Sequence, residues 1–225
     1  MREAKKKKKR RLLRMIAVLL VFYLIGVVIV SFININITNI YISGNYYLTD
    51  QQVIDAAKIT DYPNLIGNNP WVIKSRLKKN PYISNAKITL KWLGQVYINI
   101  NERKRLFINK RTNQLVLSNG IIVKNDNQAT PILINYVPTA KYKKLITAMS
   151  ELDRDILKRI SDIVYQPNEV DDERFVLTMT DRNIVYINII RFKKLNKYDN
   201  IKVELNNSRG ILNLDYGTNF EVKNW

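Results

Sequence analysis

The side chains that usually carry enzyme chemistry are sparse in this 225-residue chain. There is no histidine and no cysteine, so the commonest general base and all thiolate chemistry are absent. The densest carboxylate group, residues 171–173, precedes an expected strand and is typical of a solvated turn. Lys74 and Ser75 are neighbours on an expected helix, where adjacent side chains do not face each other as a nucleophile and its base would. The sequence predicts a protein that is not an enzyme and has no catalytic residues, cofactor or metal.

Charge and hydropathy change sharply along the N-terminal part of the chain. Residues 1–14 contain nine Lys or Arg and one acid, out of a formal net charge of +18, which leaves +10 for the remainder. Residues 15–33 contain no charge, and as a helix they would extend about 28 Å, close to the thickness of a hydrocarbon core. The run is longer than the roughly 7–15 apolar residues of a cleaved signal, and no small-residue cleavage site follows it. We therefore expect a basic cytoplasmic tail (1–14), a single-pass transmembrane signal anchor (15–33) and an extracytoplasmic remainder.

The region 34–103 has the pattern of a small α+β unit. Alternating Ile40 and Ile42 predict a strand, and the pair Gly44-Asn45 predicts the turn that ends it. A helix should begin at Thr49, because Gln52 completes a capping box, and a second helix should begin with Pro70. Two strands follow around residues 83–90 and 96–100, which gives the order β-α-α-β-β. The side chains expected to be buried by the second helix are Trp71, Ile73 and Leu77.

The region 104–225 is predicted to be a larger mixed β domain with flanking helices. Short apolar runs separated by turn residues indicate strands, and residues 142–149 carry apolar side chains at helical spacing. A hairpin is expected around residues 181–183, and a short helix is expected around residues 191–198. The last predicted strand spans residues 210–217, and we expect this C-terminal strand to be an edge of the sheet.

The order of these elements resembles that of the FtsQ/DivIB family of bacterial cell-division proteins. The first unit carries "IYISGNYYL" and "NPYISNAKITLKWLGQVYININER", which are similar to the POTRA domain of that family. The second carries "LVLSNGIIV", "FVLTMTDRNIVYI" and "GILNLDYG", which are similar to its β domain. The resemblance implies a divisome scaffold in the cell membrane at the division septum. It would bind other bitopic division proteins outside the cytoplasm and help to assemble or stabilise the septal wall-synthesis complex.

The resemblance also implies partners and a binding strand. The partners would be FtsB/DivIC-like and FtsL-like membrane proteins, besides the lipid bilayer itself, with no nucleic acid. An extended partner segment would pair with the exposed edge of the strand at residues 211–216. Within that strand Leu212 and Leu214 are expected to be core, whereas Tyr216 at its end and Phe220 beyond it are the expected contact anchors. The full set of expected partner-binding residues is Ile211, Leu212, Asn213, Leu214, Asp215, Tyr216 and Phe220.

Two other functions remain open from the residues alone. The charge of +10 outside the basic tail would suit a membrane-anchored binder of anionic cell-wall polymer, whose affinity should fall steeply with salt. An anchored hydrolase using two carboxylates distant in the sequence would show turnover of a wall substrate.

Overall fold

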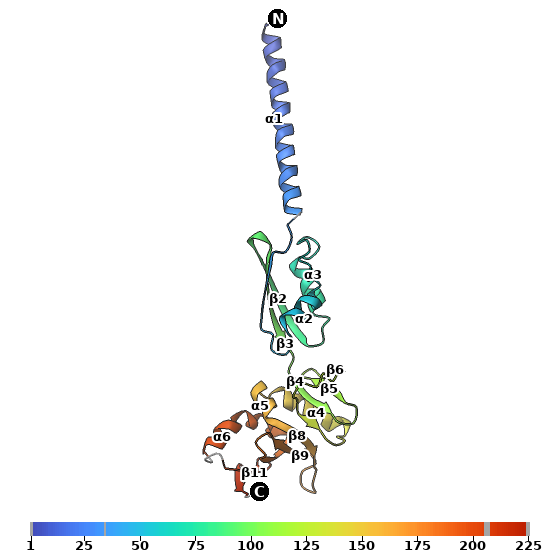
Figure 1. Ribbon diagram of the computed structural model, residues 1–225, viewed down its shortest axis with the longest axis vertical. Helices are drawn as coiled ribbons and strands as arrows, with labels where there is room; N and C mark the ends of the chain where they lie inside the picture. Colours follow the sequence, from blue (N-terminus) through green and yellow to red (C-terminus); the bar gives the residue numbers. More distant parts are fainter. Residues whose placement is uncertain (1, 34, 205–207, 224–225) are drawn as a thin grey trace. The chain divides into compact units, whose positions relative to one another are not determined.

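The computed structural model describes the chain except for residues 1, 34, 205–207 and 224–225. The chain divides into two compact units, residues 1–102 and residues 103–225 (Figure 1).

The first unit begins with one long helix, α1 (Arg2–Ile33), which contains both the basic segment and the uncharged segment. Its side chains are described for residues 13–27 and 30, so those of the basic cluster up to residue 12 lie outside the described part. In the described part of the chain, no helix is sufficiently long and apolar to cross a membrane. This finding differs from the transmembrane helix that the sequence predicts at residues 15–33.

The remainder of the first unit has the predicted β-α-α-β-β order and resembles a POTRA domain. Its elements are β1 (Asn39–Ser43), α2 (Asp50–Ala57), α3 (Pro70–Leu77), β2 (Ile83–Lys91) and β3 (Gln95–Glu102), with a short 3-10 turn, η1 (Trp92–Gly94), between the last two strands. The sheet order is β1-β3-β2, in which β1 runs parallel to β3 and β2 runs antiparallel to it. One face of this sheet packs on α2 and α3 through a buried apolar cluster that includes Val53, Ile73, Leu77, Ile98 and Ile100.

Local sequence signals explain where both helices begin. The Thr49 hydroxyl accepts the backbone N–H of Gln52, and the Gln52 side chain accepts the backbone N–H of Thr49, which is the predicted capping box. Asn69 caps α3 by accepting the N–H groups of Trp71 and Val72. Trp71 itself is 78% exposed, so the prediction that it is buried was wrong, because it lies on the solvent side of α3 opposite Ile73 and Leu77.

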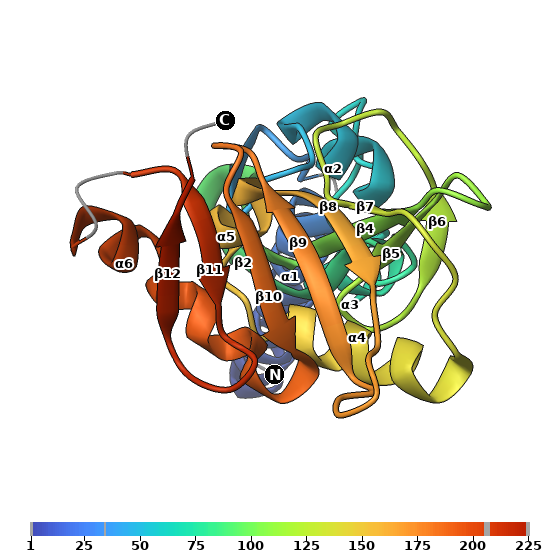
Figure 2. The same cartoon turned by 90° about the horizontal axis from the view of Figure 1, so that it is seen from below.

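The second unit is a mixed β domain with flanking helices. Its strands are β4 (Arg105–Asn109), β5 (Gln114–Leu117), β6 (Ile122–Lys124), β7 (Ile132–Leu133), β8 (Ile160–Tyr165), β9 (Arg174–Met179), β10 (Ile184–Asn188), β11 (Gly210–Asn213) and β12 (Asn219–Val222). Its helices are α4 (Thr139–Ser150), α5 (Arg154–Arg159), the 3-10 segment η2 (Ile189–Lys197) and α6 (Tyr198–Glu204). Within the described residues the strands form one sheet, in the order β12-β11-β10-β9-β8-β7-β4-β5-β6 (Figure 2).

A single apolar core joins this sheet to its helices. Strands β9 and β10 alternate buried and half-buried residues, so one face of the sheet is directed inward. The inward side chains of the strands, such as Phe175 and Val185, belong to the same buried cluster as Leu145 and Met149 of α4 and Phe192 of η2. The helix predicted at residues 142–149 and the hairpin predicted around residues 181–183 are both present.

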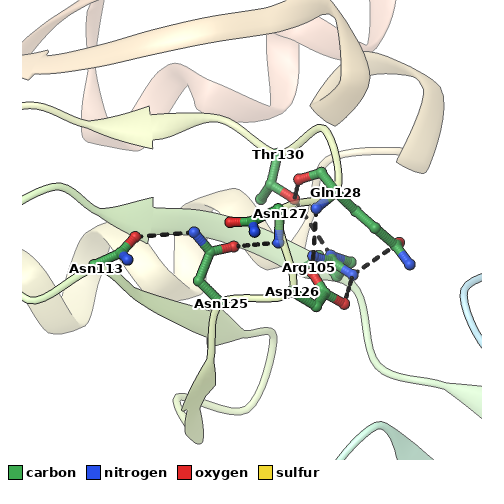
Figure 3. Close-up of polar contacts among 7 residues, drawn as sticks. All are labelled: Arg105, Asn113, Asn125, Asp126, Asn127, Gln128 and Thr130. Atoms are coloured by element: carbon green, nitrogen blue, oxygen red, sulfur yellow. Dashed lines mark hydrogen bonds and ion pairs between the residues drawn. The ribbon is translucent and has the colours of Figure 1, made fainter.

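A polar cluster at the start of β4 fixes the loop between β6 and β7 (Figure 3). The Arg105 side chain is only 2% exposed, and its guanidinium donates to both carboxylate oxygens of Asp126. It also donates to Oε1 of Gln128 at 2.9 Å and to Oγ1 of Thr130 at 3.3 Å. Because the guanidinium is hydrogen-bonded to its anion, the pKa of the Asp126 carboxyl lies below its ordinary value.

Candidate partner-binding edge

The strand predicted to be the free edge is inside the sheet. Residues 211–213 belong to β11, which pairs in parallel with β10 and antiparallel with β12. The sequence-based placement of the edge at residues 211–216 was therefore wrong: β11 ends at Asn213, and its backbone has a neighbour on each side. The outermost strand at this end of the sheet is β12, which contains Phe220 from the predicted set (Figure 2).

A buried hydrogen-bond network fixes the start of β11. Oδ1 of Asn183, a side chain in a residue that is 1% exposed, accepts the backbone N–H of Gly210 at 2.8 Å, and its Nδ2 donates to the Tyr198 hydroxyl at 2.9 Å. That hydroxyl donates to the Asp181 carboxylate at 3.0 Å, which also pairs with Lys202 at 2.7 Å. Burial raises the pKa of Asp181, but the Lys202 bond and the other hydrogen bonds outweigh this effect, so the pKa is lowered overall.

Glycine is required at the first position of β11. A Cβ on Gly210 would lie 2.0 Å from the backbone oxygen of Glu221 in β12, so a side chain would push the two strands apart. The hairpin that carries β12 can therefore lie this close to β11 only because residue 210 has no side chain.

An ion pair fixes the chain just beyond β11. Nε of Arg174 donates to Oδ2 of Asp215 at 2.7 Å, and the guanidinium lies 4.2 Å from the ring centroid of Tyr186. The Asp215 side chain is only 7% exposed, and within the described part of the molecule its Oδ1 atom has no hydrogen-bond partner. The N–H of Leu214 donates to the Tyr186 oxygen at 2.7 Å, which continues the β10 pairing one residue past the strand.

The backbone of β12 offers hydrogen-bonding groups on its outer side. In an antiparallel pair, alternate residues direct their N–H and C=O groups to the neighbouring strand. Lys223 N–H donates to the Arg209 oxygen at 3.0 Å, and Arg209 and Lys223 lie in the same register as the pairs Ile211–Glu221 and Asn213–Asn219. The intervening residues Phe220 and Val222 therefore direct their N–H and C=O groups away from β11. No strand among the described residues pairs with that side of β12.

The predicted contact side chains differ in their exposure. Leu212 and Leu214 are 1% and 0% exposed and belong to the core, as the sequence predicts. Tyr216 is 66% exposed in the loop between β11 and β12, and half-buried Phe220 packs against the core. Ile211 and Asn213 are half-buried on the opposite face of the sheet.

Sequence reasoning missed the strand β12 itself and the role of Asn183. The sequence does contain a signal for β12. Gly217 and Thr218 favour a turn after the preceding strand, and the four residues of β12 alternate between polar and apolar. The role of Asn183 has no local signal, because its partners Tyr198 and Gly210 lie 15 and 27 residues away.

The predicted turn at Gly44 and Asn45 belongs to the first compact unit. Gly44 has a φ of +80°, and a Cβ at this position would lie 2.1 Å from the Ile100 oxygen. The Asn45 side chain donates to the Asp50 carboxylate at 2.8 Å and to the Leu48 oxygen at 3.0 Å. The Glu102 carboxylate accepts the N–H groups of Tyr47 and Leu48, so the segment from β1 to α2 is fixed at several points.

Two family models match this chain, one in each compact unit. Residues 35–103 match the POTRA domain of FtsQ type, and residues 106–216 match the C-terminal domain of the cell-division proteins FtsQ/DivIB. The chain is 26% identical to the cell division protein DivIB of Listeria monocytogenes, over 97% of this chain and 86% of the relative. It is also 26% identical to DivIB of Bacillus subtilis, over 92% and 83% of the two chains. The solved extracytoplasmic domain of DivIB from Geobacillus stearothermophilus aligns at 23% identity with a TM-score of 0.39, over 48% of this chain and 97% of that one. The chain belongs to the FtsQ/DivIB family of bacterial cell-division proteins.

Proposed function

We propose that this cell-division protein is a scaffold that presents the outer edge of β12 to an extended segment of another division protein. The observation that carries the proposal is the outward orientation of the main-chain groups of Phe220 and Val222. A partner strand would form hydrogen bonds with these groups and extend the sheet beyond β12. Binding of this kind requires no catalytic residue, and assembly of a complex is its direct consequence.

The surroundings of β12 suit a strand that docks there. Val222 of β12 is exposed, as is Tyr216 in the loop that precedes this strand, so a partner side chain could cover them. The two anchors of β11, at Asn183 and at Asp215, hold the hairpin in a fixed position before any partner arrives, which lowers the entropic cost of binding.

We propose FtsB/DivIC-like proteins as the partner that adds the strand, with FtsL-like proteins in the same complex at the division septum. The family membership supports this choice of partners. The complex would help to assemble or stabilise the machinery for septal wall synthesis.

We further propose that residues 15–33 anchor the protein in the cell membrane, with residues 1–14 in the cytoplasm and both compact units outside it. The support is the uncharged run of nineteen residues and the nine basic residues before it. This topology can be tested by fusing a reporter that is active only outside the cytoplasm to each terminus in turn. Activity of such a reporter at the N-terminus, or release of the full chain from membranes by alkaline carbonate, would contradict it.

Crosslinking from the edge tests the scaffold function. A photo-reactive residue at Val222, placed in the full chain in dividing cells, is expected to crosslink a membrane-bound division protein, whereas one at Trp71 is not. When isolated membranes are irradiated at high ionic strength, the yield of the Val222 product should be retained, because main-chain pairing depends little on salt. A crosslinking yield that falls steeply with increasing salt concentration, or a product that contains only wall polymer, would instead favour the binder of anionic polymer.

A further inference from the structure

A second surface of the β domain is formed by α4 and η2, two helical elements that share the apolar core with the sheet. A hollow of about 410 Å³ lies between α4 and η2. Its lining residues come from those two elements, and none of them belongs to β11 or β12. They are Lys143, Lys144, Thr147, Ala148, Glu151, Ile189, Ile190, Phe192 and Lys193. We call this hollow the α4–η2 groove.

The recessed part of the α4–η2 groove is apolar. Ile189 and Phe192 are 5% and 1% exposed, and they lie beside half-buried Ala148. Ile190 is 78% exposed at the same place, although it follows a buried residue of the core. A recess with an apolar base and a protruding isoleucine would be covered most favourably by apolar side chains that fit into it.

The rim of the groove is basic. Lys143, Lys144 and Lys193 line it, and Glu151 is the only acid among its lining residues. Lys144 pairs with Glu173, but the ion pairs found within the described residues include none for Lys143 or Lys193. Lys194 and Lys197 continue the positive charge along η2, where with Lys193 they line a second hollow of about 490 Å³.

We propose that the α4–η2 groove binds an acidic amphipathic helix of a second protein. Such a helix carries apolar side chains at positions i, i+3, i+4 and i+7, which would enter the recess beside Ile190. Carboxylates on both sides of that apolar stripe would meet Lys143 on α4 and Lys193 on η2. The lysines raise the rate of encounter and select against basic partners, while the apolar contacts hold the complex.

An anionic membrane surface is the other partner that basic and apolar residues can attract. A bilayer covers protruding apolar groups on a flat or convex surface, whereas here most of the apolar lining is recessed between two helical elements. The concave shape therefore favours a helix, and the membrane becomes one outcome of the test.

The test uses photo-crosslinking from the full chain in dividing cells, with the reactive residue at Ile190, at Val222 or at Val170. Val170 is 82% exposed and is not among the residues that line the groove, so it reports random contacts. The Ile190 product is expected to exceed the Val170 product. Its crosslinked peptide, identified by mass spectrometry, is expected to have net negative charge and apolar residues at helical spacing.

Charge-reversal variants make the test specific to the groove. The double variant Lys143→Glu, Lys193→Glu should lower the Ile190 yield about three- to tenfold, since each exposed ion pair contributes modestly. The matched variant Lys143→Arg, Lys193→Arg should keep the yield, because the charges remain. Both lysines are exposed, so thermal unfolding of the variants should match that of the parent.

The proposal is overturned if the Ile190 product is no more abundant than the Val170 product, if it contains only lipid, or if its peptide lacks the acidic helical pattern. It is also overturned if charge reversal leaves the yield unchanged. The Val222 product reports β12 pairing separately. If the Val222 product is absent and the Ile190 product is retained, the edge function is refuted and the groove proposal is intact. If the Ile190 product is absent and the Val222 product is retained, only the groove proposal is refuted.

Discussion

Substituting Val222 by proline is the sharpest perturbation of the β12 edge. The N–H of Val222 is directed away from β11, so proline removes a donor that the folded chain does not use for its own ladder. Proline is tolerated in strands at such outward-facing edge positions. Val222 is 60% exposed, so little core packing is lost. The substitution therefore separates docking from folding.

The expected loss of affinity follows from one main-chain hydrogen bond. Removing the donor leaves the partner carbonyl unsatisfied in the new ladder, which costs about 1–3 kcal/mol. Since about 1.4 kcal/mol corresponds to a tenfold change, the dissociation constant should rise about 5- to 150-fold. The control Val222→Ala keeps the N–H group and should change the dissociation constant by less than about threefold.

The assay is titration calorimetry of the full chain in nanodiscs against the extracytoplasmic segment of a DivIC-type partner. A second control, Glu221→Pro, removes a donor that faces Ile211, so it should lower the unfolding temperature, which Val222→Pro should not. If Val222→Pro bound the partner as tightly as Val222→Ala while both remained folded, edge pairing at β12 would be refuted.

Four further substitutions test contacts within each unit by itself. Asp126→Asn should lower the free energy of unfolding at pH 7 by about 1–3 kcal/mol, because buried Arg105 loses its anion. Because folding lowers the pKa of Asp126, this stabilisation is fully present above the unfolded carboxyl pKa of about 3.9 and is lost as the pH falls through the lower folded value. In urea unfolding between pH 7 and pH 2, the free energies of unfolding of the parent and of Asp126→Asn should therefore converge as the pH falls. A difference in unfolding free energy that stays constant over this range would contradict the role of the Asp126 carboxylate. Tyr198→Phe should speed amide hydrogen exchange in β11 and β12 and cost about 1–3 kcal/mol, because Asn183 and Asp181 each lose a partner; unchanged exchange in these strands would show that the network does not hold them. Gly44→Ala should destabilise the first unit by more than about 1–2 kcal/mol in thermal unfolding, whereas Asn45→Ala should cost only about 1 kcal/mol; equal effects would argue against a steric requirement at Gly44.

The sequence was informative wherever a structure depends on neighbouring residues. Helix starts at Thr49 and Asn69 could be predicted because a capping side chain bonds a backbone group two or three residues away. The β-α-α-β-β order and the burial of Leu212 and Leu214 follow from the spacing of apolar residues. Family membership could be predicted for the same reason, since it rests on the order of these local patterns.

Burial of a single helical residue was less predictable. Trp71 lies on the face of α3 opposite the buried Ile73 and Leu77, although its large apolar ring suggested burial. A large apolar residue is buried more often than not on average, but the direction of its Cβ around the helix axis determines whether a particular residue is buried.

Tertiary structure alone decided which backbone stays free. A strand is an edge or an interior strand according to which distant segments lie beside it, and nothing within residues 211–213 records that β10 and β12 flank them. The bond from Asn183 to Gly210 and the pair of Arg105 with Asp126 likewise join residues more than twenty positions apart. The sequence by itself therefore determined most of the elements and the family, while the packing of the sheet determined that β12, and not β11, is the outermost strand at this end.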